Sequence, residues 1–496
     1  MCRVEDLVVC CILLLSCSSL CYSCYTENVE ISVSSTTTIA ETDDNFICAT
    51  LDWWPSNKCD YNQCPWGQAG LLNLDLTNKI LTNALRAFDT MRIRIGGSLQ
   101  DQVTYQVGDL INDQHQFRSE KINGMFGFSG GSLPMSRWDE LNCFFNETNS
   151  LITFGLNALI GKTKPKKGIT WTGDWSSQNA RDFMKYTISK GYKIHSYELV
   201  VFFARMEPEQ YAKDITTLKA LVNELYPDPA TQPKVLGPAG FFDKKWFAKF
   251  LEHIGKDVID GVTHHIYNLG AECEHSKTHK IVKEFVPWSG PWVGESGGAY
   301  NSGGKDVSHT FADGFWYLDQ LGMTSKHDHK VYCRQALIGG NYALLNTTTF
   351  ISNPDYYGAL LWHRLMGKQV LATSQKGSDY LRTYSHCSKK KPKVTILFIN
   401  MSNSTQFEIS VTDEGNMYKS DSASNVLSRE EYHLTPQGGN IQSDVVLLND
   451  TPLKLTPSLE IPELKPKLVD PSSPIVIARD SIVFVTIRDY KAPACA

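Results

Sequence analysis

The segment Pro291-Trp-Val-Gly-Glu-Ser-Gly-Gly298 places a glutamate where a short apolar run gives way to small residues. Runs of this kind alternate with amphipathic stretches from about residue 45 to residue 367. Such alternation is typical of a parallel α/β fold. We identify eight candidate strands, namely Phe46–Trp54, Met91–Ile95, Leu151–Leu156, Ile194–Phe203, Val235–Pro238, Val258–Tyr267, Trp292–Glu295 and Val331–Ile338.

The segments between these strands have helical character. Arg137–Phe145 carries apolar residues near helical spacing, as a helix packed against a barrel should. Similar segments are Thr77–Phe88, Ala180–Lys190, Tyr211–Tyr226 and Phe311–Leu321. Eight strands alternating with helices predict a (β/α)8 TIM barrel over residues 45–368. A doubly wound sheet is the structural alternative, but no glycine-rich phosphate loop opens any of the helices.

The chain changes character after about Lys368. Lys393–Asn400, Asp444–Leu448 and Ser481–Ile487 are strand-like, and turns rich in Gly, Pro, Asn and Ser separate them. This pattern predicts a C-terminal β-sandwich domain over residues 369–496. Residues 25–44 contain the strand-like run Glu30–Thr38, which we expect to join the same sandwich.

Composition limits the class of function. The chain has 496 residues, 42% of them hydrophobic and 20% charged, as a folded globular protein requires. Its net charge of −5 argues against a nucleic-acid partner. Two lysine-rich runs, residues 162–167 and 389–393, are expected to be solvated loops rather than sites for a polyanion. We expect no cofactor and no metal, because the cysteine spacing, including Cys59-x4-Cys64, matches no zinc site.

The N-terminus and the cysteines point to export. Leu7–Leu15 is a short apolar run followed by small residues, which predicts a signal peptide over residues 1–24. Eight cysteines follow it, and disulfides are expected for them in an oxidising compartment. Asn-x-Ser/Thr sequons predict a glycoprotein and lie at Asn146, Asn346, Asn400, Asn403 and Asn449. The predicted location is extracellular, in the cell wall, or in a lysosome or vacuole, with peripheral attachment to a membrane left open.

Chemistry in a TIM barrel sits at the carboxyl ends of the strands. Glu295 ends the seventh predicted strand, and the small residues after it let substrate approach closely, so it is the candidate catalytic carboxylate. His264 and His265 end the sixth strand, and alternation sends one of them inward and the other outward. The alternation leaves open which of the two reaches substrate.

Taken together, several motifs resemble glycoside hydrolase family 79, the heparanase and β-glucuronidase family. The motifs include Cys48-Ala-Thr-Leu-Asp-Trp-Trp-Pro55, Thr263-His-His-Ile-Tyr-Asn-Leu-Gly270, Trp292–Gly303 and Gly339-Gly-Asn-Tyr342. The resemblance implies retaining hydrolysis of glycosidic bonds in uronic-acid-containing substrates, with Glu295 as the nucleophile. It also implies a Cys387–Cys495 disulfide, and sugar contacts by Asp52, Ser98, His264, Tyr300 and Tyr342.

One departure from the family is serious. The family carries its acid/base glutamate in a Glu-Leu-Gly-Asn-Glu stretch after the fourth strand. Here Tyr197-Glu-Leu199 begins that motif, the chain continues as Val200–Met206, and the Asn-Glu pair is absent. Glu198 matches only the earlier glutamate and is a weak substitute as proton donor, while Glu207 begins the next helix. A second shortening falls between Gly270 and Pro291.

We therefore predict a secreted retaining β-glucuronidase or heparanase-like endoglycosidase, impaired by the loss of its acid/base motif. A glycosidase without its general acid typically loses about 10²–10⁴ in rate. The main alternative is a non-catalytic glycan-binding pseudoenzyme on the same scaffold, and a weaker one is a structural protein of the wall. The expected partner is a glucuronide, an acidic polysaccharide or a proteoglycan.

Overall fold

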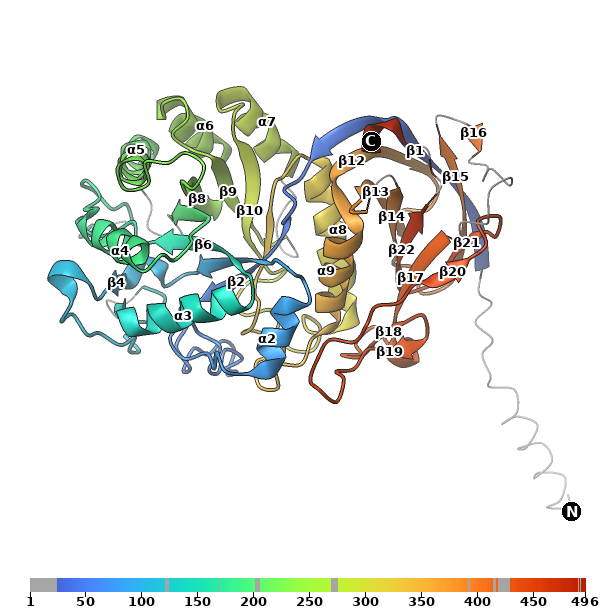
Figure 1. The fold of residues 1–496 in the computed structure, drawn as a ribbon, viewed down its shortest axis with the longest axis horizontal. Coiled ribbons are helices and arrows are strands. Elements are labelled where there is room, and N and C mark those ends of the chain that lie inside the picture. Colours follow the sequence, from blue (N-terminus) through green and yellow to red (C-terminus); the bar gives the residue numbers. More distant parts are fainter. Residues whose placement is uncertain are drawn as a thin grey trace, which may run out of the picture.

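The computed structural model describes residues 25–120, 125–167, 169–200, 206–268, 275–390, 393–413, 416–417, 429–488, 490 and 492–496. The predicted signal peptide and Cys273 lie outside these residues. Two bodies stand side by side, with helices α8 (Phe311–Lys326) and α9 (Pro354–Leu365) between them (Figure 1). No helix in these ranges is long and apolar enough to cross a membrane.

The first body is a closed barrel of eight parallel strands in the order β10-β11-β2-β3-β6-β7-β8-β9, counted over the described residues. This confirms the predicted TIM barrel. Each strand coincides with one of the eight predicted runs. Their bounds are β2 (Ile47–Asp52), β3 (Arg92–Gly96), β6 (Leu151–Leu156), β7 (Ser196–Leu199), β8 (Lys234–Phe241), β9 (Gly261–Ile266), β10 (Gly290–Ser296) and β11 (Tyr332–Arg334).

Helices surround the barrel because their apolar stripes pack on the strands. One core cluster contains Trp138 and Leu141 of α3 (Met135–Glu147), Phe183 of α4 (Gln178–Ser189) and Phe154 of β6. A short parallel pair, β4 (Val103–Tyr105) and β5 (Gly131–Leu133), extends the β3–α3 connection. The helices are α2 (Lys79–Arg86), α3 (Met135–Glu147), α4 (Gln178–Ser189), α5 (Pro208–Leu225), α6 (Lys244–His253), α7 (His275–Phe285), α8 (Phe311–Lys326) and α9 (Pro354–Leu365).

The second body is a largely antiparallel sheet that curves over its own core (Figure 1). The N-terminal strand β1 (Tyr25–Glu41) belongs to it, since β1 pairs antiparallel with β12 and parallel with β15. The remaining strands are β12 (Met366–Lys376), β13 (Leu381–Ser388), β14 (Val394–Asn400), β15 (Thr405–Asp413), β16 (Asn416–Met417), β17 (Arg429–Pro436), β18 (Val446–Leu448), β19 (Thr451–Pro452), β20 (Lys467–Val469), β21 (Ile475–Ile477) and β22 (Ser481–Ile487).

The two faces of this sheet bury different partners because side chains alternate along a strand. In β14, Ile396 and Phe398 enter the core of the sheet itself. Their neighbours Leu397 and Ile399 join the barrel core instead. Tyr384 of β13 donates a hydrogen bond to Asp319 of α8 at 2.6 Å. The sheet is thereby fixed against the barrel through α8 and α9.

Disulfides tie distant parts of the chain together. The Cys387–Cys495 bond implied by the family resemblance is present and holds the chain end to β13. Cys48–Cys333 joins β2 to β11 across 285 residues, and Cys59–Cys64 closes a five-residue step after β2. Closing a loop by a disulfide restricts the unfolded chain most when the loop is long. Cys143 has no disulfide partner among the described residues.

Candidate active site

A buried arginine joins two carboxylates in the barrel interior, one of them Glu295. Arg94 of β3 donates from Nε to Glu198 of β7 at 2.6 Å and from Nη1 to Glu295 of β10 at 3.2 Å. All three side chains are almost wholly buried. A buried guanidinium shared by two carboxylates fixes both in orientation, because leaving either unpaired in this environment would be costly.

The surroundings of Glu295 suit an ionised nucleophile. The Tyr267 hydroxyl donates to Oε1 at 2.6 Å, and His265 Nδ1 lies 3.9 Å from the same oxygen. Burial raises the pKa of Glu295 above its ordinary value, while the charge of Arg94 and the Tyr267 hydrogen bond oppose that rise. Burial and the nearby Glu295 raise the pKa of the Tyr267 phenol, so its hydroxyl remains a donor.

Glu295 opens into a cavity with two lobes. The inner lobe, about 240 Å³, contains Glu295 at its wall. The outer lobe, about 350 Å³, continues it toward solvent, and Asp60, Tyr267 and Tyr300 line both. Aromatic rings dominate the inner lobe, and aromatic faces are the surfaces that sugar rings pack against. They come from Trp54, Trp66, Phe126, Phe241, Tyr267, Tyr300 and Tyr342.

Three of the predicted sugar contacts line this cavity. Ser98, which follows β3, and Tyr342, which follows β11, belong to the inner lobe. Tyr300 stands at the rim, and the residue is 62% exposed. The structure brings these three together with Glu295 from separate loops at one end of the barrel, as a TIM-barrel site requires.

Asp52, also a predicted sugar contact, lies at the end of β2, buried beneath the cavity and not among the residues that line it. Its Oδ2 accepts a hydrogen bond from Gln335 Nε2 at 2.8 Å, and Gln335 itself lines the inner lobe. Within the described chain, Asp52 Oδ1 has no hydrogen-bond partner. Burial, and then the charge of Glu295, raise the pKa of Asp52 to about 8, so the group is neutral at pH 7. Gly97, at φ +92°, leaves the space: a Cβ there would lie 2.4 Å from Asp52 Oδ2.

The expectation for His264 is corrected. Its imidazole faces away from the cavity and lies 2.9 Å from His329 Nε2, with Phe242 also against it. His265 is the inward member of the pair, close to Glu295. Burial and the charge of Arg94 lower the pKa of His265 well below its ordinary value, so the ring is neutral. The prediction that one histidine points inward and the other outward is confirmed. The family resemblance, however, implied a sugar contact by the outward residue, His264.

The β7 side of the cavity, where the family carries its proton donor, contributes no carboxylate from the described residues. Glu198 is wholly buried, is held by Arg94, and does not line the cavity. Glu207 is exposed and occupies the N-cap position of α5, where its side chain makes no capping hydrogen bond. Residues 201–205, where the motif departs from the family, lie outside the described residues. Among the residues that are described, only Asp60 and Glu295 contribute carboxylates to the inner lobe.

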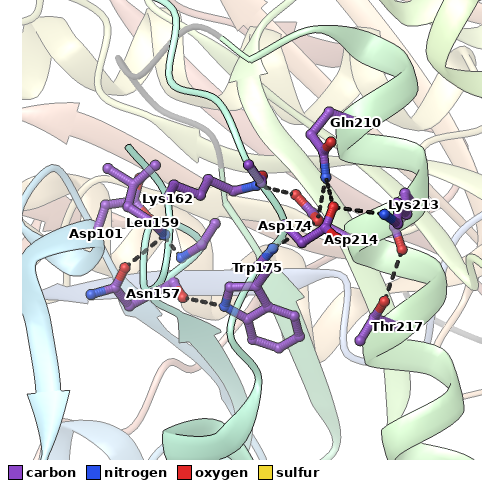
Figure 2. Close-up of polar contacts among 12 residues, drawn as sticks. Asp101, Asn157, Leu159, Lys162, Asp174, Trp175, Gln210, Lys213, Asp214 and Thr217 are labelled. Atoms are coloured by element: carbon purple, nitrogen blue, oxygen red, sulfur yellow. Dashed lines mark hydrogen bonds and ion pairs between the residues drawn. The ribbon is translucent and has the colours of Figure 1, made fainter. Parts of the chain in front are cut away.

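The loop beside that wall is firmly anchored. Lys162, predicted to lie in a solvated basic loop, is instead buried and donates to Asp214 of α5 at 2.5 Å (Figure 2). Asp214 also accepts from the backbone of Trp175 at 3.1 Å, and the Trp175 indole donates to the Asn157 carbonyl at 2.9 Å. The β6–α4 loop is therefore fixed to the start of α5, directly after the stretch where the acid/base motif is missing.

Three residues that contact Glu295 or line the cavity, Arg94, Lys58 and Asp60, were not predicted from the sequence. Arg94 had a usable signal, because a charge at alternate positions of a buried strand must find a partner inside the barrel. Asp60 and Lys58 had none, since the Cys59–Cys64 disulfide and the fold of their loop bring them to the cavity. Lys58 donates to Asp60 at 2.8 Å, and the Ser302 hydroxyl hydrogen-bonds the same carboxylate. The described residues contain no cluster of three or more His, Cys, Asp or Glu suited to a metal.

A closed parallel barrel with a buried carboxylate at a strand end, opening into an aromatic-lined cavity, defines a TIM-barrel protein of the glycoside hydrolase type. Comparison with known proteins gives the family. The model of the glycosyl hydrolase family 79 N-terminal domain matches residues 28–284 and 273–322. The chain belongs to glycoside hydrolase family 79, as its motifs predicted.

Individual relatives agree with this assignment. The chain is 46% identical to heparanase-like protein 2 of Arabidopsis thaliana, covering 95% of this chain and 96% of the relative. It is 40% identical to baicalin-beta-D-glucuronidase of Scutellaria baicalensis, with 90% of each chain covered. Among solved structures, the GH51 alpha-L-arabinofuranosidase of Thermotoga petrophila shares the fold, with a TM-score of 0.64 over 93% of this chain and all of that one, at 12% identity.

Proposed function

We propose that this protein is a retaining β-glucuronidase or endoglucuronidase in which Glu295 is the nucleophile. The observation that carries the proposal is the setting of Glu295. Arg94 and Tyr267 orient and stabilise its carboxylate at the wall of an aromatic-lined cavity. A retaining glycosidase forms a glycosyl–enzyme bond at such a group and then hydrolyses it. The named activity of the Scutellaria relative supports a glucuronide as substrate.

The second carboxyl group sets the limit on rate. Retaining enzymes place acid/base and nucleophile about 5–5.5 Å apart. Arg94 ties Glu198 into the barrel interior, and Glu207 points to solvent at the start of α5. Asp60 lines the cavity, but Lys58 and Ser302 already bind its carboxylate. The enzyme is therefore slow on substrates whose leaving group needs a proton.

A purified-protein assay tests the proposal. The chain and its Glu295→Gln variant are compared on 4-nitrophenyl β-D-glucuronide, whose leaving group departs without protonation. We expect release of nitrophenolate by the unchanged chain and a loss on the order of 10⁴-fold or more in the variant, as when a covalent nucleophile is removed. Equal rates for the two proteins would refute the role of Glu295.

The alternative, a non-catalytic glycan-binding protein, is favoured by one observation. Glu198, the carboxylate that best matches the family motif, is locked in an ion pair away from the cavity. On this alternative the unchanged chain binds a glucuronide but releases no nitrophenolate. Calorimetry with the uncleaved 4-nitrophenyl β-D-thioglucuronide separates this outcome from a chain that neither binds nor cleaves.

Export is part of the same proposal, with the wall, the extracellular space and the lysosome or vacuole as locations and peripheral membrane attachment left open. The three disulfides suit an oxidising compartment. The sequons are not equally accessible. Asn400 is wholly buried, and its Nδ2 donates to the Thr405 and Ala478 carbonyls at 2.8 Å. The amide of Asn449 donates to the carbonyls of Glu431 and Lys465.

The remaining sequons, Asn146, Asn346 and Asn403, are exposed. We therefore expect glycans at these three positions and none at Asn400, because a glycan on Nδ2 would remove buried hydrogen bonds. Peptide mass mapping after expression through the secretory pathway, with and without an N-glycosidase, measures this. A glycan on Asn400 of folded protein would contradict the expectation, and a chain with no glycan at all would count against export.

A further inference from the structure

A second large cavity lies far from Glu295, where helix α9 faces the sheet. Its volume is about 690 Å³, within the range of ligand sites in proteins. One side is the last turn of α9, including Arg364, and the other is formed by the neighbouring strands β14, β22 and β17. None of its lining residues lines either lobe of the active-site cavity.

Positive charge dominates this groove, although the chain as a whole is negative. Four cationic side chains line it, those of Arg364, Lys390, Lys393 and Arg488. It has two acidic residues, and each has its own cation: Glu430 pairs with Arg488, and Glu463 with Lys465 at 3.1 Å. Within the described residues, neither Lys390 nor Lys393 lies within 4 Å of a carboxylate.

Hydroxyl, aromatic and aliphatic side chains form the floor of the groove, and all of them are largely buried. Hydroxyls cross three strands in a row: Ser388 lies 2.7 Å from Thr395, which lies 3.0 Å from Thr486. The ring of Tyr432 and the apolar side chain of Leu464 lie beside them. Lysine and arginine above a line of hydroxyls and apolar faces suit a ligand that carries carboxylates and hydroxyls on rings with apolar CH surfaces.

We propose that this groove is a second, non-catalytic binding site for a linear acidic polysaccharide, which reverses the expectation that the run at residues 389–393 is only a solvated loop. Charge complementarity selects the anion, and the concave shape of the groove suits a polymer strand rather than a flat lipid surface. The proposal does not depend on catalysis at Glu295. A chain bound here stays tethered to the protein, so its other segments reach the active-site cavity at a raised effective concentration.

The test is calorimetric titration of the full chain with a hexamer of α-1,4-linked galacturonate, and with cellohexaose as the neutral oligosaccharide. Lys390→Glu/Lys393→Glu turns two attractive charges into repulsive ones. The matched control is Lys244→Glu/Lys256→Glu, two exposed lysines at the start of α6 and just after its end, and α6 is a barrel helix that lies apart from the sheet (Figure 1). Both double variants change the net charge equally.

We expect the unchanged chain to bind the galacturonate hexamer and not cellohexaose. The groove variant should bind it about tenfold more weakly, and the α6 variant should bind it within twofold of the unchanged chain. Circular dichroism and the rate on 4-nitrophenyl β-D-glucuronide show that each variant is folded. Equal weakening in both variants would mean that net charge alone drives binding, and no weakening in the groove variant would place the hexamer elsewhere. Either result overturns the proposal.

Discussion

The two sides of the active-site cavity differ in the carboxylates that the described residues place there. On the β10 side, Glu295 has a hydrogen-bond donor, a counter-ion and an aromatic wall. On the β7 side, the one carboxylate at the strand, Glu198, faces inward to Arg94. The difference teaches how the proposed function divides the site: separate strands carry its nucleophilic and its proton-donating half, so one half can be kept while the other is lost.

The largest expected effect separates the two halves by leaving group. Attack by Glu295 needs no acid when the leaving group is a stable anion, whereas an alkyl glucuronide needs a proton. We expect a nitrophenyl glucuronide to react in a burst followed by a slow phase, and alkyl glucuronides to be cleaved about 10²–10⁴-fold more slowly than by a complete enzyme. Stopped-flow absorbance and product analysis measure this.

Two experiments test whether a missing acid/base group causes the slow cleavage. Azide should enter the space of the missing acid/base and restore turnover as a β-glycosyl azide. Inserting Gly-Asn-Glu after Leu199, with the family's glycine-rich loop, should restore cleavage of alkyl glucuronides. Ordinary rates on those substrates without azide would contradict the proposed loss, and Glu198→Gln would then reveal whether Glu198 has become the acid.

The second prediction asks how strongly the β6–α4 loop beside β7 is held to α5. Lys162→Met leaves Asp214 buried without its counter-ion (Figure 2). Breaking a buried pair in this way typically costs about 3–5 kcal/mol in the free energy of unfolding. Urea unfolding measures it, and Lys166→Met, at an exposed position of the same loop, should change it by less than about 0.5 kcal/mol. Equal effects would mean that the loop is loosely held.

The third prediction probes the β10 side. Tyr267→Phe removes the 2.6 Å hydrogen bond to Glu295 while keeping the ring. A hydrogen bond to a charged group contributes about 1.5–3 kcal/mol, so kcat/KM should fall about 10- to 100-fold. The bond lowers the pKa of Glu295, so its loss should move the acid limb of the pH–rate profile to higher pH. Tyr300→Phe, at the exposed rim, should leave that limb in place.

Much of the barrel could be predicted from sequence because each strand is a short apolar run between polar segments. Leu151–Leu156 coincides with β6, and Glu295 was predicted from its place after Pro291-Trp-Val-Gly. The β domain was less predictable. Only three strands after residue 368 were expected, since strands such as β20 (Lys467–Val469) are short and exposed, and pairing rather than apolar pattern defines them.

Features that depend on tertiary contacts were out of reach. The sequence could not show which of His264 and His265 faces inward, because the strand's position around the barrel sets that choice. In the sequence, Lys162 is one of several lysines in a basic run. It forms a buried ion pair because the fold brings it next to Asp214, 52 positions later. Sequence pattern records local periodicity, whereas these roles come from long-range packing.

The smallest effect concerns Asp52, which lies beneath the nucleophile. Burial and the charge of Glu295 raise its pKa to about 8, so the carboxyl is neutral over most of the working range and ionises as pH rises through that value. A new negative charge there would repel both Glu295 and a uronate substrate. In a complete retaining enzyme the basic limb reports the general acid, which the proposed function takes to be missing here. We therefore expect a basic limb near pH 8 that comes from Asp52. Asp52→Asn, which keeps the neutral form at every pH, should move this limb upward and change the rate at pH 6 by less than about threefold. The pH dependence of kcat/KM on 4-nitrophenyl β-D-glucuronide measures it. An unchanged basic limb in the variant would assign that ionisation to another group and contradict the prediction.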